Sequence, residues 1–332
     1  MTVQPAAVYL TTYLAQLAPL LARPDVTDLY VNRPGEVWVE TLAGGLERHE
    51  APGLDDTTLW RLARQIASLS HQGVNREHPL LSATLPDGAR VQIIAPPATR
   101  GPMALAVRKH VTADLSLDDY ARDGFFDRTR IDAVSEAAAL DAELRALLDG
   151  GRTVEFLRQA VLRRKNIVVA GGTSTGKTTF VNALLKEIPR RERLILIEDA
   201  AEVRIEHPNA VGLLAVRGET GEAKVTTEDL LQACLRMRPD RIILGELRGR
   251  EAASFLRAVN TGHPGSITTL HADSPTGAIE QLSLMVLQAG LNLGRAEIAA
   301  YVRSVVDVFV QLSRHDGRRA VSQIVFRPSL DG

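Results

Sequence analysis

The segment Gly171–Thr178 constrains the fold of this chain more than any other. Its sequence, Gly-Gly-Thr-Ser-Thr-Gly-Lys-Thr, matches the phosphate-binding loop pattern G-x-x-x-x-G-K-[ST] at every defined position. It directly follows the apolar run Ile167–Ala170 and precedes a helical spacing of Val181, Leu184 and Leu185. In such a strand–loop–helix unit, glycines let successive backbone N–H groups point inward, and the helix N-terminus adds its positive end. We therefore predict a phosphate site at this loop.

The same loop predicts ATP and Mg²⁺ as ligands. Lys177 would bridge the β- and γ-phosphates, and the hydroxyl of Thr178 would ligate the metal ion. The residues expected to bind the nucleotide are Gly171, Gly172, Thr173, Ser174, Thr175, Gly176, Lys177, Thr178 and Thr179. The alternative is a glycine-rich turn with an exposed lysine. Lysine is rare in this chain, which argues against a chance match.

A second apolar run, Ile242–Leu244, ends near a carboxylate. From Arg241 to Glu246 the sequence is Arg-Ile-Ile-Leu-Gly-Glu, so the acid is a glutamate that follows a glycine rather than an aspartate. A glutamate at the tip of such a strand can orient or deprotonate an attacking water molecule. We predict that Glu246 is catalytic, the alternative being a solvated strand end.

Two further carboxylates, Glu198 and Asp199, follow the apolar run Leu194–Ile197. The C-terminal ends of parallel strands gather at one edge of a sheet, where ligands bind. Either carboxylate is therefore a candidate to hold Mg²⁺, and Glu198 is also a candidate catalytic residue. Glu202 is a weaker candidate. A helix cap or a surface pair is the structural alternative.

Two histidines, His263 and His271, flank the expected strand Ser266–Leu270. His271 lies at its C-terminal end, where it could reach the γ-phosphate and report its presence. Neither histidine has ligand-like spacing to a cysteine, so no zinc site is expected. A structural role is the alternative for both.

The order of expected strands and helices along the chain predicts two domains. Residues 151–332 alternate short β-branched strands with helices, as in an α/β domain with a mainly parallel, doubly wound sheet. Residues 1–110 mix helices with meandering strands, which indicates a smaller α+β domain, and residues 111–150 are expected to form a linker with some helix. The strands expected in the first domain are Asp28–Val31, Glu36–Glu40, Ala89–Ala95 and Ala104–Arg108. The strands expected in the second domain are Ile167–Ala170, Leu194–Ile197, Ile242–Leu244, Ile267–Leu270 and Val305–Leu312.

The overall charge gives no reason to expect a nucleic-acid partner. The formal net charge is −1 and the sequence pI is about 6.7. The basic clusters Arg163–Lys165 and Arg190-Arg191 contain no interleaved aromatic residues, so they read as solvated helix ends. Direct binding of nucleic acid is therefore not expected.

Three observations favour a cytoplasmic protein. No apolar run is long enough to span a membrane, and no basic start typical of a signal peptide is present. Cys234 is the only cysteine, and its place on the apolar side of an expected helix predicts a buried thiol. The stretch Ala6–Ala22 is expected to form an amphipathic helix that packs on its own domain, with a membrane-surface helix as the alternative.

Taken together, these motifs resemble the type II/type IV secretion ATPase superfamily. Leu235–Arg248 resembles its Walker B region, Leu196–Asp199 its Asp box, and Asn260–Ser274 its His box. Upstream, Val31–Glu40 and Leu85–Gln92 resemble the N-terminal domain of the type IV secretion branch, the VirB-eleven family.

The resemblance implies a homo-hexameric ring of two-domain subunits, each with a RecA-like C-terminal domain. It implies a cytoplasmic motor that hydrolyses ATP and works with inner-membrane secretion-system components. Peripheral association with the inner membrane is compatible with this resemblance. It also implies N-terminal arginines that contact the phosphates, which match Arg90 and Arg108 here. Linker length in this family affects which subunit's site each N-terminal domain covers, so these arginines could act within one subunit or across a boundary.

Other functions remain open at the level of sequence. A pilus or type II secretion motor of the same superfamily is one, although type II enzymes usually carry a four-cysteine zinc insertion that Cys234 alone cannot form. A ring scaffold that binds ATP for assembly and turns over little is another, and in it Glu246 would be idle.

Overall fold

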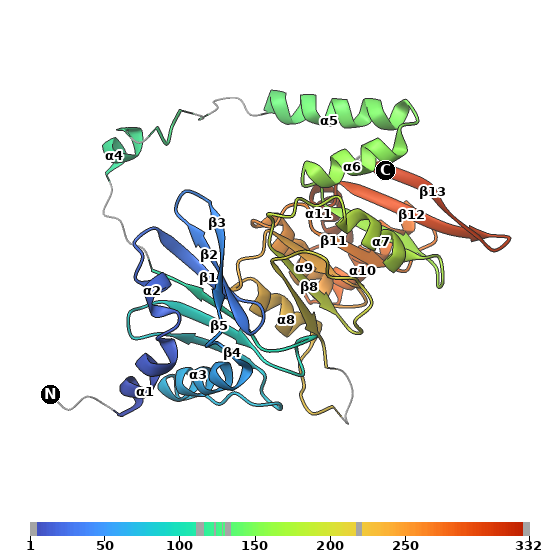
Figure 1. Cartoon of the computed structure of the whole chain (residues 1–332). Coiled ribbons are helices and arrows are strands. Elements are labelled where there is room, and N and C mark those ends of the chain that lie inside the picture. Colours follow the sequence, from blue (N-terminus) through green and yellow to red (C-terminus); the bar gives the residue numbers. More distant parts are fainter. Residues whose placement is uncertain are drawn as a thin grey trace.

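The computed structural model describes two sheets joined by a helical connection (Figure 1). The described residues are 5–110, 116–122, 124–127, 129, 134–216 and 221–327. Parts of the expected linker 111–150 lie outside these residues, as do both ends of the chain. Among the described residues, no helix is long and apolar enough to cross a membrane.

The N-terminal sheet has six antiparallel strands in the order β3-β2-β1-β6-β5-β4. The strands are β1 (Val26–Val31), β2 (Gly35–Thr41), β3 (Leu46–Ala51), β4 (Leu80–Thr84), β5 (Arg90–Ile94) and β6 (Ala104–Arg108). Its helices are α1 (Pro5–Leu14), α2 (Ala18–Leu21) and α3 (Asp56–Leu69). The side chain of Asp55 caps α3 by accepting a hydrogen bond from the backbone N–H of Thr58.

The central strands of this N-terminal sheet are buried on both faces, and the two-residue period of a strand decides which side chain goes to which face. Leu29 and Val31 belong to the cluster that packs with α3, whereas Tyr30 between them belongs to the cluster of the C-terminal domain. In β2, Val37 and Val39 face the first cluster and Trp38 the second. The sheet therefore lies between its own helices and the second domain.

The predicted helix within Ala6–Ala22 forms as two short helices, α1 and α2, with a break between them. Leu17 is fully buried, and Tyr13 and Leu20 pack against the N-terminal core. This segment therefore packs on its own domain, as expected.

The C-terminal sheet has seven strands in the order β13-β12-β7-β11-β10-β8-β9, and all pairs are parallel except β12 with β13. The strands are β7 (Ile167–Gly171), β8 (Leu194–Glu198), β9 (Ala210–Leu214), β10 (Arg241–Leu244), β11 (Ile267–Leu270), β12 (Val308–His315) and β13 (Arg318–Phe326). The predicted α/β fold with a mainly parallel sheet, preceded by a smaller α+β domain, is confirmed.

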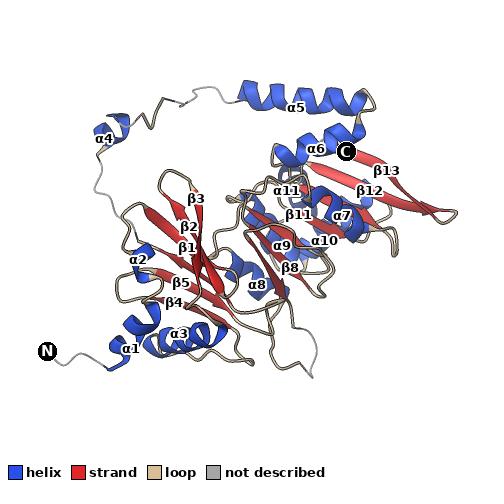
Figure 2. Cartoon of the chain, in the orientation of Figure 1, coloured by secondary structure: helices blue, strands red, loops and turns tan. Residues whose placement is uncertain are grey.

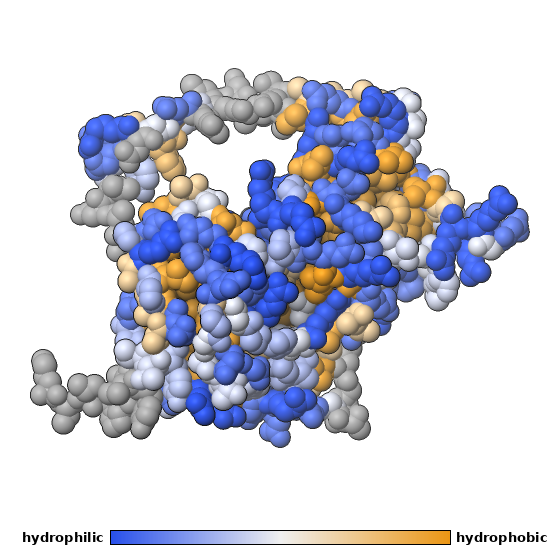
Figure 3. Space-filling model, viewed as in Figure 1, coloured by the Kyte–Doolittle hydropathy of each residue, from blue (hydrophilic) through white to orange (hydrophobic). Residues whose placement is uncertain are grey.

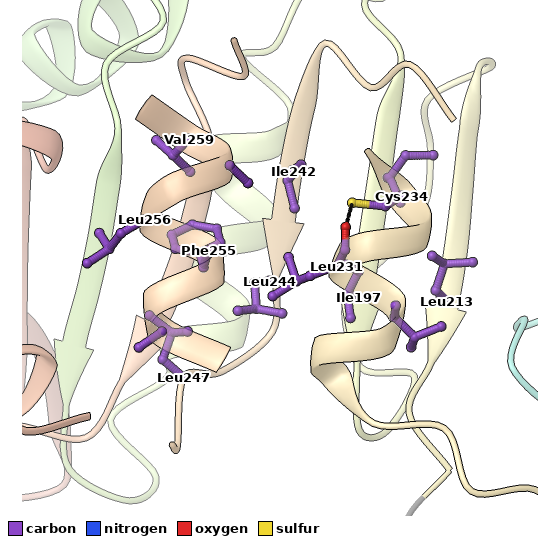
Figure 4. Packing of buried hydrophobic residues seen from close by; sticks show 14 of the residues in the cluster. Ile197, Leu213, Leu231, Cys234, Ile242, Leu244, Leu247, Phe255, Leu256 and Val259 are labelled. Carbon is purple, nitrogen blue, oxygen red and sulfur yellow. Dashed lines mark hydrogen bonds between the residues drawn. The ribbon is translucent and has the colours of Figure 1, made fainter. Parts of the chain in front are cut away.

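Helices cover both faces of this sheet (Figure 2). Helices α6 (Thr153–Leu162) and α7 (Lys177–Leu185) pack on one face. On the other face lie α8 (Thr227–Cys234), α9 (Glu251–Asn260), α10 (Pro275–Leu287) and α11 (Arg295–Val305). Figure 4 shows Phe255 of α9 and Leu231 of α8 on either side of Leu244 of β10.

Cys234 lies in this second core and is fully buried (Figure 4). Its Sγ donates to the carbonyl oxygen of Leu231 at 3.1 Å. Burial raises the pKa of the thiol well above its usual value, so the thiolate is disfavoured. The prediction of a buried thiol is confirmed.

The connection between the domains contains α4 (Leu117–Arg122) and α5 (Val134–Asp149). Helix α5 packs on α6 and buries Leu144 in the C-terminal core. Ion pairs from Asp141 to Lys165 (2.6 Å) and to Arg327 (3.0 Å) hold α5 against the second domain.

The sequence patterns missed four strands and misplaced the start of one. β3 and β13 are edge strands with several exposed polar side chains, so they lack an apolar run; Figure 3 shows the far end of the β12–β13 hairpin as a hydrophilic protrusion. β4 and β9 are the other two edge strands; β4 carries polar residues at Ser82 and Thr84, and Gly212 interrupts the apolar run of β9. The predicted strand Val305–Leu312 was wrong at its start, because Val305 ends α11 and β12 begins only at Val308.

A buried arginine joins the two domains. Arg193 is 1% exposed, and its guanidinium carbon lies 4.0 Å from the ring centre of Tyr30 in the N-terminal sheet. Its nitrogens donate to Asn32 Oδ1 (2.7 Å) and to the carbonyl of Met237 (2.9 Å). Burial lowers the pKa of Arg193 to about 10, so it remains charged at neutral pH. Nearby, Arg238 of the second domain pairs with Glu40 of the first.

We expect Arg193→Met to lower the free energy of unfolding by about 2–4 kcal/mol, because the half-buried oxygen of Asn32 and the buried carbonyl of Met237 lose their donor. Urea unfolding followed by circular dichroism measures the change. Arg61→Met, on the exposed face of α3, is the control and should shift stability by less than about 0.5 kcal/mol. Equal effects of the two substitutions would contradict the interface described here.

Candidate nucleotide-binding site

The loop between β7 and α7 has the backbone shape that its glycines predict. Gly176 stands at the N-terminus of α7 with φ of 93°, in the left-handed region that favours glycine. A Cβ at Gly171 would lie 2.6 Å from Thr175 Oγ1 and 3.0 Å from the carbonyl oxygen of Leu312. The hydroxyl of Thr175 donates to the carbonyl of Gly172 at 2.9 Å and fixes the turn. The loop therefore opens a helix N-terminus, where an anion binds favourably.

The ammonium of Lys177 lies over this loop. Its Nζ donates to the carbonyl oxygens of Gly171 (2.8 Å) and Gly172 (3.2 Å) and stands 3.3 Å from Nδ1 of His271. Partial burial lowers the pKa of Lys177, the nearby Glu246 acting in the opposite sense.

The predicted residues Glu246 and His271 meet at the same place. His271 Nε2 lies 2.7 Å from Glu246 Oε1, so one imidazole stands between the lysine and the glutamate. The other carboxylate oxygen, Oε2, accepts a hydrogen bond from Nε of Arg248 at 2.6 Å. Arg248 also reaches Asp199 at 3.6 Å. Parallel pairing of β7, β11, β10 and β8 thus brings Lys177, His271, Glu246 and Asp199 to one edge of the sheet.

Steric crowding explains why a glycine, Gly245, precedes Glu246. A Cβ at this position would lie 2.9 Å from Cγ of Glu198 on the neighbouring strand. The backbone of Gly245 is fixed on both sides, since its N–H donates to Ile197 (2.8 Å) and its carbonyl accepts from the hydroxyl of Thr269 (2.7 Å). An aspartate at this position would therefore collide with Glu198.

The predicted metal ligands separate into two groups. Glu202, the weaker candidate from sequence, is the one that contacts the loop: its Oε2 accepts from the Thr178 hydroxyl at 3.0 Å. Glu198 is buried, and its Oε1 accepts from the backbone N–H groups of Glu202 (3.1 Å) and Val203 (2.9 Å). Its Oε2 pairs with Arg100 of the N-terminal domain. Glu198 thus holds the loop that carries Glu202.

The donors around Thr178 fit Mg²⁺. They are oxygens, from the Thr178 hydroxyl and the carboxylates of Glu202, Asp199 and Glu246, that line one cavity with Lys177 and His271. In the parts of the chain that the structure describes, no three His, Cys, Asp or Glu side chains are arranged to cage a metal by themselves. This suits Mg²⁺, which usually takes one or two protein ligands beside phosphate oxygens and water.

The chain is similar to known proteins along most of its length. The family described as "Type II/IV secretion system protein" matches residues 134–324. The type IV secretion system protein VirB11 of Brucella suis is 42% identical over 326 residues, covering 96% of this chain and 90% of that protein. VirB11 of Bartonella henselae is 37% identical over 330 residues, covering 96% and 92%.

The chain belongs to the VirB11 family of type II/IV secretion system proteins.

A solved structure supports membership along nearly the whole chain. The VirB11 ATPase of the Brucella suis type IV secretion system, crystallised in complex with sulphate, superposes with a TM-score of 0.90 at 40% identity. The superposition covers 98% of this chain and 96% of that one. Both sheets and their order along the chain are therefore those of a VirB11 protein.

The structure does not bring the two arginines that the family resemblance suggested, Arg90 and Arg108, to this site. They face each other as cross-strand partners on β5 and β6 and are exposed. They line a different cavity, together with Arg236 and Arg238 from the segment after α8. Within the described part of this chain, these arginines and the phosphate-binding loop lie in separate cavities.

Three arginines around the site were not predicted from sequence. Arg248 holds Glu246, and Arg100 reaches Glu198 from the other domain. Arg319 of β13 donates its Nε to the carbonyl of Ser174 at 3.1 Å and packs against Gly176. Arg248, two residues after Glu246, could have been found from its spacing, whereas Arg100 and Arg319 carry no local signal.

We expect Gly245→Ala to destabilise the protein by about 1–3 kcal/mol, because the new methyl group would press on the buried side chain of Glu198. The midpoint of urea unfolding measures this. Gly73→Ala is the matched control, since a Cβ there meets nothing within 4 Å. A Gly245→Ala protein as stable as the control would show that Glu198 is not packed as described.

Proposed function

We infer that this VirB11-family chain hydrolyses ATP to power a type IV secretion system. The observation that carries the inference is the row of contacts from Lys177 through His271 to Glu246, directly beside the phosphate-binding loop. A loop that binds phosphates and a carboxylate that can act on water are the two parts that hydrolysis requires. Family membership favours type IV secretion over the pilus and type II motors.

Each side chain in the site has a proposed task. The loop residues Gly171–Thr179 and the ammonium of Lys177 bind the phosphates. Glu246 orients the attacking water and accepts its proton, while Arg248 and His271 fix its carboxylate from two sides. His271 also contacts Lys177. A phosphate that binds the lysine is therefore expected to shift the imidazole and, through it, the carboxylate of Glu246.

Mg²⁺ would be held by the hydroxyl of Thr178, with Glu202 and Asp199 as nearby carboxylates. When bound, the ion offsets charge on the β- and γ-phosphate oxygens. Glu198, also expected from sequence as a catalytic and metal residue, fits better as support for the neighbouring loop, because both of its oxygens already have partners.

The proposed assembly is a homo-hexameric ring at the cytoplasmic side of the inner membrane, working with inner-membrane secretion components. The proposed divisions are an N-terminal domain at 1–110, a linker at 111–150 and a nucleotide-binding domain at 151–332. Since Arg90 and Arg108 line a cavity away from the loop of their own chain, we propose that they contact nucleotide bound to a neighbouring subunit. Guanidinium groups suit this task because their planar fork binds phosphate oxygens bidentately.

Lys177→Ala is expected to abolish ATP hydrolysis and to weaken nucleotide binding, because the loop loses its only side-chain ammonium. Phosphate release and the affinity for a fluorescent ATP analogue are the measurements. Lys186→Ala is the matched control, since this lysine stands at the other end of α7. Normal turnover by the Lys177 variant would rule out the assigned phosphate site.

Glu246→Gln is expected to bind ATP with an affinity within about threefold of the wild type and to lower kcat by about 10²–10⁴-fold, because an amide cannot accept the proton of water. Glu280→Gln, an exposed glutamate on α10 paired with Arg295, serves as the control. If wild-type protein binds ATP but releases no phosphate above the Lys177→Ala blank, the chain is an ATP-dependent scaffold instead.

A further inference from the structure

The turn that follows β5 joins the N-terminal domain to the edge of the C-terminal sheet. Thr99 forms an antiparallel bridge with Leu213 of β9. On either side, the N–H of Arg100 donates to the carbonyl of Gly212 (2.9 Å), and the N–H of Leu214 donates to the carbonyl of Ala98 (3.0 Å). The turn therefore covers the edge strand β9 and holds the backbone of Arg100 in place.

The side chain of Arg100 continues from this turn toward the nucleotide site. Its Cδ and Cγ lie so close to Gly212 that a Cβ on that glycine would be 2.5 Å from Cδ. One guanidinium nitrogen donates to the carbonyl of Val203 at 2.5 Å, and the other pairs with Oε2 of Glu198. The side chains of Arg100 and Glu198 are only 16% and 3% exposed, so water contributes little to solvating either charge.

The partners of Arg100 are the two ends of one short loop. Glu198 begins it, at the end of β8, and Val203 closes it. Within the loop, Glu198 Oε1 accepts the N–H groups of Glu202 and Val203, and this places the Glu202 carboxylate on the hydroxyl of Thr178. Contacts thus run without a gap from Arg100 through Glu198 to Glu202 and Thr178.

We propose that Arg100 is a positioning residue of the nucleotide site. It acts from the N-terminal domain, through Glu198 and the loop 199–203, to hold Glu202 beside the metal-binding hydroxyl of Thr178. This rests on the proposed function, because it concerns the Mg²⁺ side of the same ATP site. A site arranged in this way is complete only while the N-terminal turn is seated on β9.

The test begins with hydrogen exchange of the nucleotide-free full-length protein, which needs no activity. In Arg100→Gln, the peptide that contains the Glu202 and Val203 amides should exchange at least about tenfold faster, while β7 and α7 stay protected. Arg76→Gln is the matched control, since it removes an exposed ion pair between Arg76 of the first domain and Glu222 of the second. Unchanged exchange in Arg100→Gln would overturn the proposal.

The second measurement is the Mg²⁺ concentration needed to support binding of a fluorescent ATP analogue. Loss of a residue that orients a metal ligand typically weakens metal binding by about 10–100-fold. We therefore expect the required Mg²⁺ concentration to rise by about 10–100-fold in Arg100→Gln and in Glu202→Gln. The double variant should be no worse than either single one, because both act through the same carboxylate. Arg100→Lys should show an intermediate Mg²⁺ requirement. A single ammonium cannot contact both Glu198 and Val203 in the way that the forked guanidinium does.

These outcomes separate the proposal from the function on which it rests. An unchanged Mg²⁺ requirement in a well-folded Arg100→Gln protein, or effects that add fully in the double variant, would overturn the role of Arg100 and leave the ATPase intact. Gly212→Ala, whose Cβ would displace Arg100 together with the end of Ile205 and would remove no charge, should reproduce the loss if Arg100→Gln folds poorly. Failure of the wild type to bind the analogue would overturn both.

Discussion

Parallel pairing of β7, β11, β10 and β8 is the constraint on which the nucleotide site depends. Each of these strands is buried on both faces and carries its functional group at or just beyond its C-terminal end. Regular register between the strands brings the four ends to one edge, so residues more than seventy positions apart in sequence, such as Lys177 and His271, come within hydrogen-bonding distance. Any substitution that shifts this register would dismantle the site without touching a ligand.

The central part of this arrangement could be predicted from the sequence, for a physical reason. A strand that is buried on both faces is a continuous apolar run, so Ile267–Leu270 can be recognised in the sequence. A phosphate-binding loop needs glycines at fixed positions, so Gly171–Thr178 can be recognised as well. Edge strands such as β3 and β13 expose much of their surface and carry polar residues, so periodicity could not find them. The same patterns ranked Glu202 below Glu198, because Arg100, the partner that occupies Glu198, comes from another domain and leaves no signal near either glutamate.

The interface between the domains is held by arginines as well as by apolar packing. Tyr30 and Trp38 extend the core of the C-terminal domain, but Arg193 and Arg100 bring buried or nearly buried charge to the same boundary. The guanidinium of Arg193 donates directional hydrogen bonds to Asn32 and Met237, and such bonds weaken steeply when their geometry changes, so these contacts tolerate little sliding. The boundary therefore fixes one relative position of the two sheets more strictly than an apolar surface of equal area would.

The burial of Cys234 has a practical consequence. The chain has no other cysteine, and this thiol is enclosed by α8 and the sheet with its ionisation suppressed. Maleimide reagents react with accessible thiolates, so the native protein is expected to react with them very slowly. Pairs of engineered surface cysteines could therefore carry fluorescent or spin labels on either side of the domain boundary, without first removing a natural residue from the core.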